Sequence, residues 1–312
     1  MSKTYLVTGG AGFIGSNIAE ELVNAGKNVR VIDNLLTGKM ENMNTFKDKI
    51  DFINGDIRSL DTVMQVMEGV DYVIHQAALP SVPKSVEIPI ESNEHNINGT
   101  LNILYAAKES GVKRVVYAAS SSAYGDTPEL PKVETMRPMP LSPYAVNKLA
   151  SEYYCSAFTE VYGLETVSLR YFNVFGPRQD PTSYYSAVIP KFISALLKNE
   201  KPIIFGDGEQ SRDFTYIDNV VQANLLACTA SSVSGGVFNI ACGERITLNQ
   251  LYAELQEILK TSISPIYEDP RVGDVRHSLA DIAKAKKHLG FEVKVSFKEG
   301  LQRTVDWFSN NQ

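Results

Sequence analysis

The stretch TGGAGFIGSN at residues 8–17 places Gly9, Gly12 and Gly15 after a short apolar run and before a helical pattern. Glycines at this spacing, between a strand and a helix, are typical of a turn that binds a dinucleotide. The first glycine permits the tight turn, and the second lets a pyrophosphate approach the backbone at the helix N-terminus. The third lets helix and strand pack closely. The stretch therefore predicts a dinucleotide-binding unit at the start of the chain.

Asp33 ends the next expected strand, NVRVID at 28–33. A carboxylate at this place can hold the hydroxyls of an adenosine ribose and would repel a 2′-phosphate, so NAD is favoured over NADP. Two alternatives stay open: Asp33 is a solvated turn residue, or the nearby Lys39 allows some use of NADP. NAD is the cofactor that we expect.

Strand-like and helix-like segments alternate over the first half of the chain. The expected strands are 4–9, 28–33, 51–56, 71–78, 114–119 and 166–172. The expected helices are 17–26, 60–68, 92–110 and 143–162. Strands separated by helices indicate parallel βαβ units with right-handed crossovers. The expected fold class is α/β, a doubly wound parallel sheet of the Rossmann type.

The alternation weakens after residue 172, where the segment PRQDPTSYYS at 177–186 is typical of a loop. Helices are expected at 187–199, 216–230, 247–260, 279–289 and 297–309. These segments predict a smaller, mixed α/β C-terminal substrate lobe. Residues 1–172, with about 214–242, would form the NAD-binding domain, and about 173–213 and 243–312 the substrate lobe.

Composition excludes several classes of function. The 312 residues carry a net charge of −6 and no run of Lys or Arg, which makes nucleic acid and anionic membranes poor partners. Three widely spaced cysteines and four histidines form no ligand motif, so neither a metal site nor a disulfide framework is expected. No apolar stretch approaches 18 residues, and no leader pattern opens the chain. We expect a cytoplasmic enzyme.

A tyrosine and a lysine form the first candidate for chemistry. In SPYAVNKLASE at 142–152, Tyr144 and Lys148 stand four apart and share one helix face, while Pro143 suits the first helical turn. A nearby ammonium and a positive nicotinamide would both lower the tyrosine pKa. Tyr144 could then take a proton from an alcohol while hydride leaves for NAD⁺. As an isolated pattern, such a pair more often consists of two exposed surface residues without a catalytic role.

The stretch SSSAYG at 120–125 follows the apolar run RVVYAA, so three serines stand at the end of a buried strand. A polar turn would explain them equally well. Beside Tyr144, however, Ser120 could share the alcohol oxygen by a hydrogen bond, with Ser122 as its assistant. Which of the two serines touches the oxygen stays open at this point.

These motifs together resemble the extended short-chain dehydrogenase/reductase family, in the NAD-dependent branch that acts on nucleotide sugars. The resemblance covers nearly the whole chain and is closest to UDP-glucose and UDP-N-acetylglucosamine 4-epimerases. It also includes GDIR (55–58), HQAA (75–78), NINGT (96–100), RYFNVFGPRQ (170–179), DGEQSRDFTYIDN (207–219) and RVGDVRHSLAD (271–281). It implies a UDP-sugar substrate and a homodimer that pairs through helices 92–110 and 143–162.

The resemblance also implies roles for individual residues. It implies cofactor contacts at Gly9, Gly12, Phe13, Ile14, Gly15, Asp33, Asn34, Asp56, Ile57, Gln76, Ala77, Ala78, Asn96, Tyr144, Lys148 and Tyr171. Among these, Asp56 and Ile57 would flank the adenine. It implies substrate contacts at Ser121, Asn173, Val188, Arg212, Arg271, Asp274 and Ser278. Asn173 would bond a phosphate oxygen, the two arginines would pair with the diphosphate, and Asp274 would accept from ribose hydroxyls.

The serines also bear on which reaction is expected. The dehydratases of the family resemble one another in an Asp-Glu pair where this chain has Ser121 and Ser122. A serine is a poor acid or base at neutral pH, which weighs against dehydration and decarboxylation. What remains is inversion of C4 through a transient 4-keto sugar. The alternatives are a 4,6-dehydratase, a UDP-glucuronate decarboxylase or epimerase, and a non-catalytic NAD-binding module.

Ser278 bears on which sugar is expected. Its position resembles one that faces the 2-substituent of the sugar and holds a bulky tyrosine in epimerases restricted to glucose and galactose. A small residue leaves room for an N-acetyl group without requiring it. Alternatively, Ser278 could cap the helix expected from Leu279.

Overall fold

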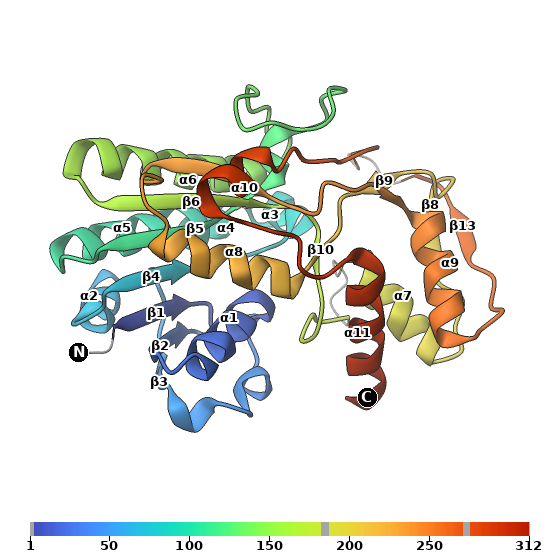
Figure 1. Ribbon diagram of the computed structural model, residues 1–312, viewed down its shortest axis with the longest axis horizontal. Coiled ribbons are helices and arrows are strands. Elements are labelled where there is room, and N and C mark those ends of the chain that lie inside the picture. Colours follow the sequence, from blue (N-terminus) through green and yellow to red (C-terminus); the bar gives the residue numbers. More distant parts are fainter. Residues whose placement is uncertain (1–2, 182–186, 271–274, 312) are drawn as a thin grey trace.

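Seven parallel strands form the central sheet of the computed structural model, in the order β11-β6-β5-β4-β1-β2-β3 (Figure 1). The structure describes residues 3–181, 187–270 and 275–311. The sheet strands are β1 (Thr4–Thr8), β2 (Asn28–Asp33), β3 (Asp51–Asn54), β4 (Tyr72–His75), β5 (Arg114–Ser120), β6 (Glu165–Tyr171) and β11 (Gly236–Ile240).

Helices cover both faces of this sheet (Figure 1). One apolar core joins Val73 and Val115 to Ile103 and Cys155, under α2 (Leu60–Met67), α5 (Gly99–Glu109) and α6 (Pro143–Tyr162). The other joins strand residues such as Ile74 to α1 (Phe13–Asn24) and α8 (Ile217–Thr229). Successive strand residues point to opposite faces, so a strand that is covered on both sides must be apolar throughout. The doubly wound Rossmann-type sheet is confirmed.

A smaller lobe lies beyond the carboxyl ends of the strands, at the right of Figure 1. Its helices are α7 (Val188–Leu197), α9 (Leu248–Leu259) and α11 (Phe297–Asn310), while α10 (Ala283–Leu289) packs near β11. Its short strands pair two by two: β7 (Val174–Phe175) with β10 (Thr215–Tyr216), β8 (Ile203–Phe205) with β13 (Ile266–Glu268), and β9 (Ser211–Arg212) with β12 (Ile246–Thr247).

Several local predictions differ from the structure. The segment predicted as a single helix at 92–110 is α4 (Pro89–Asn93), a π-helical turn (Glu94–Asn98) and α5. The helix predicted from Leu279 begins at Ala283, because the residues before it extend beside neighbouring segments, with bridges at His277 and Ala280. Ser278 is therefore not its N-cap. The sequence also failed to predict α3 (Val82–Glu87).

A buried ion pair ties α6 to the sheet. Glu152 on α6 accepts two hydrogen bonds from Arg170 on β6, at 2.6 and 2.9 Å, and both side chains are almost fully buried. The Arg170 guanidinium lies over the Tyr124 ring, 4.7 Å from its centre, and the Tyr124 hydroxyl donates to Asn239 at 2.7 Å. These contacts connect α6, β6 and the turn after β5.

Replacement of Glu152 by Ala should cost about 3–5 kcal/mol in the free energy of unfolding, because Arg170 would keep a buried charge without a partner. Urea denaturation measures this loss. Glu299→Ala is the matched control, since the Glu299–Arg303 pair is half-exposed and its loss should cost no more than about 1 kcal/mol. Equal losses in the two variants would contradict the role assigned to the buried pair.

Candidate functional site

The glycine turn between β1 and α1 is closely packed on its protein side. Gly9 has φ +68°, and a Cβ there would lie 2.7 Å from the backbone N of Ala77. A Cβ on Gly15 would lie 2.1 Å from the Gly9 oxygen, so helix and turn touch through glycine alone. Gly12 differs, because its Cβ would meet only the Gly9 oxygen, at 3.2 Å. The turn thus leaves room for a ligand at the N-terminus of α1, where free N–H groups favour a phosphate.

Asp33 lies buried at the end of β2. Its carboxylate accepts from the backbone N of Ala11 at 3.0 Å and of Leu35 at 2.8 Å. Burial raises its pKa, and the two N–H bonds oppose that shift. Each carboxylate oxygen retains a lone pair, so the group can still accept from ribose hydroxyls. Lys39, considered above for NADP, pairs with Asp180 at 3.0 Å.

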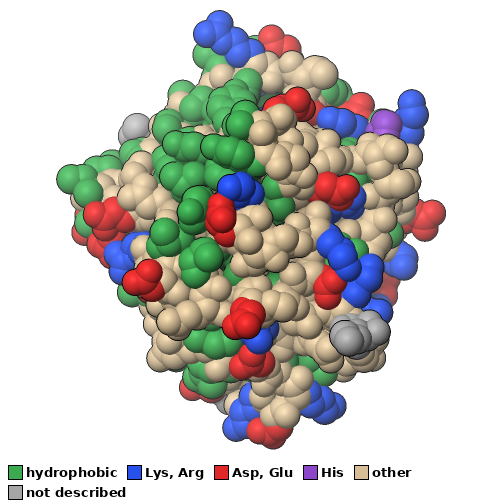
Figure 2. All heavy atoms as spheres, turned by 90° about the vertical axis from the view of Figure 1, so that its left-hand side faces the viewer, with side chains coloured by type: hydrophobic (Ala, Val, Ile, Leu, Met, Phe, Trp, Pro, Cys, Tyr) green, Lys and Arg blue, Asp and Glu red, His purple; other side chains and the backbone are tan. Residues whose placement is uncertain are grey.

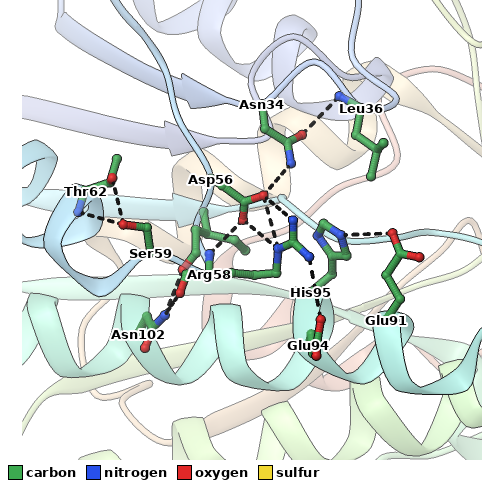
Figure 3. Close-up of polar contacts among 11 residues, drawn as sticks. Asn34, Leu36, Asp56, Arg58, Ser59, Thr62, Glu91, Glu94, His95 and Asn102 are labelled. Atoms are coloured by element: carbon green, nitrogen blue, oxygen red, sulfur yellow. Dashed lines mark hydrogen bonds and ion pairs between the residues drawn. The ribbon is translucent and has the colours of Figure 1, made fainter.

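Asp56 and Asn34 belong to one polar network (Figure 3). Asp56 accepts from Arg58 Nη2 at 2.8 Å and from Asn34 Nδ2 at 3.0 Å. Burial opposes ionisation of Asp56, but the bonds from Arg58 and Asn34 hold its pKa well below the usual range. Ile57 packs against Gly99, where a Cβ would lie 2.5 Å from it. This network borders a surface hollow lined by Asp56, Arg58, Ser59, Glu94 and Asn98.

The remaining residues predicted to contact the cofactor surround the glycine turn and the end of β4. Phe13 and Ile14 open α1, and Ala77 and Ala78 follow β4; all four are half-buried. Gln76 Nε2 donates to the Tyr171 hydroxyl at 3.0 Å, and both contact Asn224 on α8. Asn96 clamps the backbone of Leu79, accepting from its N at 2.7 Å.

The tyrosine, the lysine and the serines meet at the ends of β5 and α6. The Tyr144 side chain lies near enough to Ser120 for that serine to lower its pKa, and the Ser122 hydroxyl donates to the Ser120 oxygen at 2.8 Å. The Lys148 ammonium donates to the backbone oxygen of Ala118 at 2.9 Å. Ser121 begins the short 3₁₀ turn Ser121–Tyr124. All four residues proposed for catalysis therefore lie together, with Ser120 between Ser122 and Tyr144.

Burial dominates the electrostatics of Tyr144 and Lys148. Burial raises the pKa of Tyr144 to about 12, and the Ser120 hydrogen bond offsets only part of that shift. Burial also lowers the pKa of Lys148 to about 8. The expected lowering of the tyrosine pKa depends on a bound nicotinamide as well as on the ammonium, so it stays a prediction for the complex with NAD. Desolvation outweighs the other effects here, because the Lys148 ammonium points to a carbonyl.

Near the residues predicted to contact the substrate, Asp213 holds several backbone segments in place. Its buried carboxylate accepts from the backbone N of Cys242, Gly243 and Ala280, at 2.9–3.1 Å. Burial raises its pKa to about 6, against the effect of these bonds. Asp213 thereby holds the loop after β11 and the segment that carries Ser278 in fixed positions.

Asn173, at φ +33°, faces this segment. Its Nδ2 donates to the Asp213 backbone oxygen at 3.0 Å and to Ser278 Oγ at 3.2 Å. Both amide hydrogens are thus used inside the protein, whereas the expected bond to a phosphate oxygen requires a donor. In this arrangement the Asn173 side chain offers its Oδ1 to donors instead.

Other residues predicted to contact the substrate are less informative. Val188 begins α7, and Arg212 on β9 donates to the backbone oxygens of Ser211 and Arg276. Arg271 and Asp274 lie outside the described residues. Among the described residues, no cluster of three or more His, Cys, Asp or Glu could hold a metal ion.

Ser85 also contacts Tyr144, and this contact was not predicted from the sequence. Its hydroxyl accepts from the backbone N of Tyr144 at 3.0 Å and so supports the first turn of α6. Ser85 lies on α3, whose start is marked by the cap Ser81 and by Pro83 in the first turn. A serine followed by a proline is a helix-start signal that could have revealed this helix.

Fold and site together define a class: a Rossmann-type enzyme with a buried Tyr–Lys pair at the end of its dinucleotide-binding sheet. The model of the NAD dependent epimerase/dehydratase family matches residues 5–241. The chain belongs to this family. NAD is its cofactor, and the glycine turn and Asp33 fit that dinucleotide. No described helix is both long enough and apolar enough to span a membrane.

Solved structures and curated relatives cover the whole chain. A UDP-N-acetylglucosamine 4-epimerase from Methanobrevibacter ruminantium, in complex with UDP-N-acetylmuramic acid, is 44% identical, with a TM-score of 0.95 and coverage of 100% of this chain and 99% of that one. A Thermotoga maritima UDP-glucose 4-epimerase with UDP-glucose is 41% identical, with a TM-score of 0.95 and 99% coverage of both. A UDP-glucuronate 4-epimerase of Thermodesulfobacterium geofontis is 38% identical over 98% of this chain and 96% of its own length. The chain is thus an enzyme of the UDP-sugar epimerase group.

Replacement of Gly12 by Ala should weaken NAD binding at least tenfold, while the melting temperature of the free protein falls only slightly. The added methyl group meets only the Gly9 oxygen, in a tight contact at 3.2 Å, and occupies the approach to the N-terminus of α1. Titration calorimetry with NAD⁺ measures the affinity. Gly26→Ala, beyond the far end of α1, is the control: its φ of +68° should reduce stability but leave NAD affinity unchanged. Unaltered NAD affinity in Gly12→Ala would contradict this assignment.

Proposed function

We propose that the chain is a UDP-hexose 4-epimerase that accepts UDP-glucose and UDP-galactose, and also their N-acetylated counterparts. The observation that carries the proposal is the group of Ser120, Ser122 and Tyr144, together with Ser121 and Ser122 at the positions where the dehydratases have carboxylates. Elimination of water requires an acid and a base beside the sugar, which serines do not provide. Inversion of C4 requires only a proton acceptor on the 4-oxygen and a hydride acceptor.

The roles of the residues follow from their positions. NAD⁺, held by the glycine turn and Asp33, would supply a reversible hydride acceptor for C4, so that no net oxidation would result. The ionised Tyr144 oxygen would take the proton of the 4-hydroxyl and later return it, and Ser120, itself supported by Ser122, would hold that oxygen. Lys148 would favour the ionised tyrosine through its charge. Burial of Tyr144 opposes this ionisation, and a bound nicotinamide would add positive charge that favours it.

The purified chain should convert UDP-galactose and UDP-N-acetylgalactosamine to their C4 epimers, without consuming added NAD⁺. Chromatography of the nucleotide sugars measures the products. Tyr144→Phe should lower kcat by at least about a hundredfold, because the proton acceptor is lost, and should leave NAD affinity unchanged.

A third incubation with UDP-glucuronate distinguishes the alternatives. Epimerisation of the uronate alone, release of CO₂, or formation of a 4-keto-6-deoxy sugar would overturn the proposed substrate class. Bound NAD without turnover of any of these sugars would indicate a non-catalytic module.

Ser278 is the proposed site of sugar selection. Its hydroxyl lies beside Asn173 and accepts from the backbone N of Asp213 at 3.3 Å. Ser278→Tyr should lower kcat/KM for the acetylated sugar at least tenfold relative to UDP-galactose, since the larger ring takes the space of the acetyl group. Ser278→Ala is the size-matched control and should keep the ratio near its original value. A constant ratio in Ser278→Tyr would refute this assignment.

We further propose a cytoplasmic homodimer that pairs through α5 and α6. Hydrophobic side chains gather on the upper part of the face in Figure 2, where the ends of these helices lie. The two helices expose large apolar side chains at Tyr105, Val146, Tyr153, Tyr154, Val161 and Tyr162. Exposed apolar clusters of this kind are typical of protein interfaces.

Light scattering should give twice the chain mass of 34.4 kDa. Tyr153→Glu should shift the mass toward a single chain, because the charge would have to be buried in the interface. Ile203→Glu, on an exposed strand of the smaller lobe, is the control and should stay dimeric. A monomeric parent protein, or the same mass in both variants, would rule out this interface.

A further inference from the structure

His75, the last residue of β4, is a buried side chain that the proposed reaction does not use. It is 1% exposed, and both ring nitrogens have partners. Nδ1 lies 2.7 Å from the Thr8 hydroxyl, and Nε2 lies 2.9 Å from the Thr100 hydroxyl. We propose that His75 is a positioning residue for NAD: it joins two supports that hold the segment 76–79 against the glycine turn.

The hydrogen positions follow from the partners. The Thr100 hydroxyl donates to the backbone oxygen of Asn96 at 2.6 Å, because a carbonyl can only accept. Thr100 has no second hydrogen, so its oxygen must accept from His75 Nε2–H. Neutral imidazole carries one N–H, which leaves Nδ1 as an acceptor for the Thr8 hydroxyl. The Thr8 oxygen in turn accepts from the backbone N of Ala77 at 3.1 Å.

The chain of hydrogen bonds therefore runs in one direction, from Ala77 through Thr8, His75 and Thr100 to Asn96. Every hydroxyl in it donates once and accepts once. A second proton on His75 would place an N–H against the Thr8 hydroxyl and leave that hydroxyl without its acceptor. Burial and the nearby Lys148 charge lower the pKa of His75 to about 3, which keeps the neutral pattern in place.

Both ends of the chain hold the same segment. At one end Thr8 fixes the backbone of Ala77. At the other, Asn96 accepts from the backbone N of Leu79 at 2.7 Å and donates to its oxygen at 3.3 Å. The backbone oxygen of Asn96 also accepts from Ser151 on α6, at 2.9 Å. Asn96 itself lies in the π-helical turn Glu94–Asn98, an irregularity that often marks a functional site.

The position of this segment matters for the cofactor because of Gly9. Ala77 approaches Gly9 so closely that a Cβ would not fit between them. A shift of Ala77 therefore changes the shape of the glycine turn itself. On its other side His75 faces the Tyr117 ring, 5.7 Å between ring centres, and the Lys148 ammonium lies 5.1 Å from that ring. His75 thus lies between the phosphate-binding turn and the Tyr–Lys pair.

NAD affinity of the full chain, measured by calorimetry after removal of bound cofactor, tests this role. Thr100→Val keeps the volume and removes the acceptor of His75 Nε2–H, so NAD affinity should fall roughly tenfold. Thr100→Ser restores the hydroxyl and should stay within about twofold of the parent protein. His75→Gln breaks the Thr8 end of the chain and should show a similar loss, which keeps the test available if Thr100→Val does not fold.

Two comparisons separate positioning from general destabilisation. Val63→Ala, a fully buried change in the same core, should lower stability but leave NAD affinity unchanged. The double variant His75→Gln/Thr100→Val should lose no more affinity than the single variants, because residues of one network are not additive. NAD affinity within twofold of the parent in Thr100→Val, or equal losses in Val63→Ala, would overturn the proposal. No sugar is present in these measurements, so their outcome does not depend on the proposed substrate.

Discussion

The buried pair of Glu152 and Arg170 is the interaction on which the arrangement of the site depends. Glu152 lies on α6, eight residues after Tyr144 and four after Lys148, while Arg170 lies on β6. The pair therefore fixes how α6 lies against β6. Arg170 also supports Tyr124, which closes the turn that begins with the serines. One ionic contact, shielded from water, therefore sets the distance between the helix of Tyr144 and the turn of Ser120. Removing a partner from such a pair is costly, which makes this geometry rigid.

The two sides of the site are built by different means. On the cofactor side, backbone meets backbone: Gly9 lies against Ala77, and Gly15 against Gly9, with no room for a side chain. Around the residues predicted to contact the substrate, buried polar groups position the loops, above all Asp213 with its bonds to three backbone N–H groups. This cradle of closely packed backbone has a fixed shape, which suits a cofactor that stays the same throughout the family. Side chains such as Ser278 can change without disturbing that cradle, which fits the role in sugar selection proposed for Ser278.

The electrostatics of Tyr144 connect these two sides. In the chain alone, burial makes the tyrosine a weaker acid, and the Lys148 ammonium is bonded to Ala118. In the proposed reaction, the positive charge that favours ionised Tyr144 would come from bound NAD⁺ and from Lys148. In the proposed reaction, this arrangement would keep the base inactive until NAD⁺ is in place. The serines beside Tyr144 supply hydrogen bonds but no negative charge. A pair of carboxylates at these positions would add negative charge.

The sequence by itself determined the sheet, the glycine turn, Asp33 and the Tyr–Lys pair. These features depend on spacing along a single segment: glycines in a turn, apolar runs in strands, and two residues four apart on a helix. Only the tertiary structure decided what each polar atom does. It placed Ser278 in an extended segment rather than at a helix start, used both amide hydrogens of Asn173, and joined Thr8, His75 and Thr100 into one chain. Those partners come from distant segments, and a hydrogen bond forms only where folding brings a donor and an acceptor together.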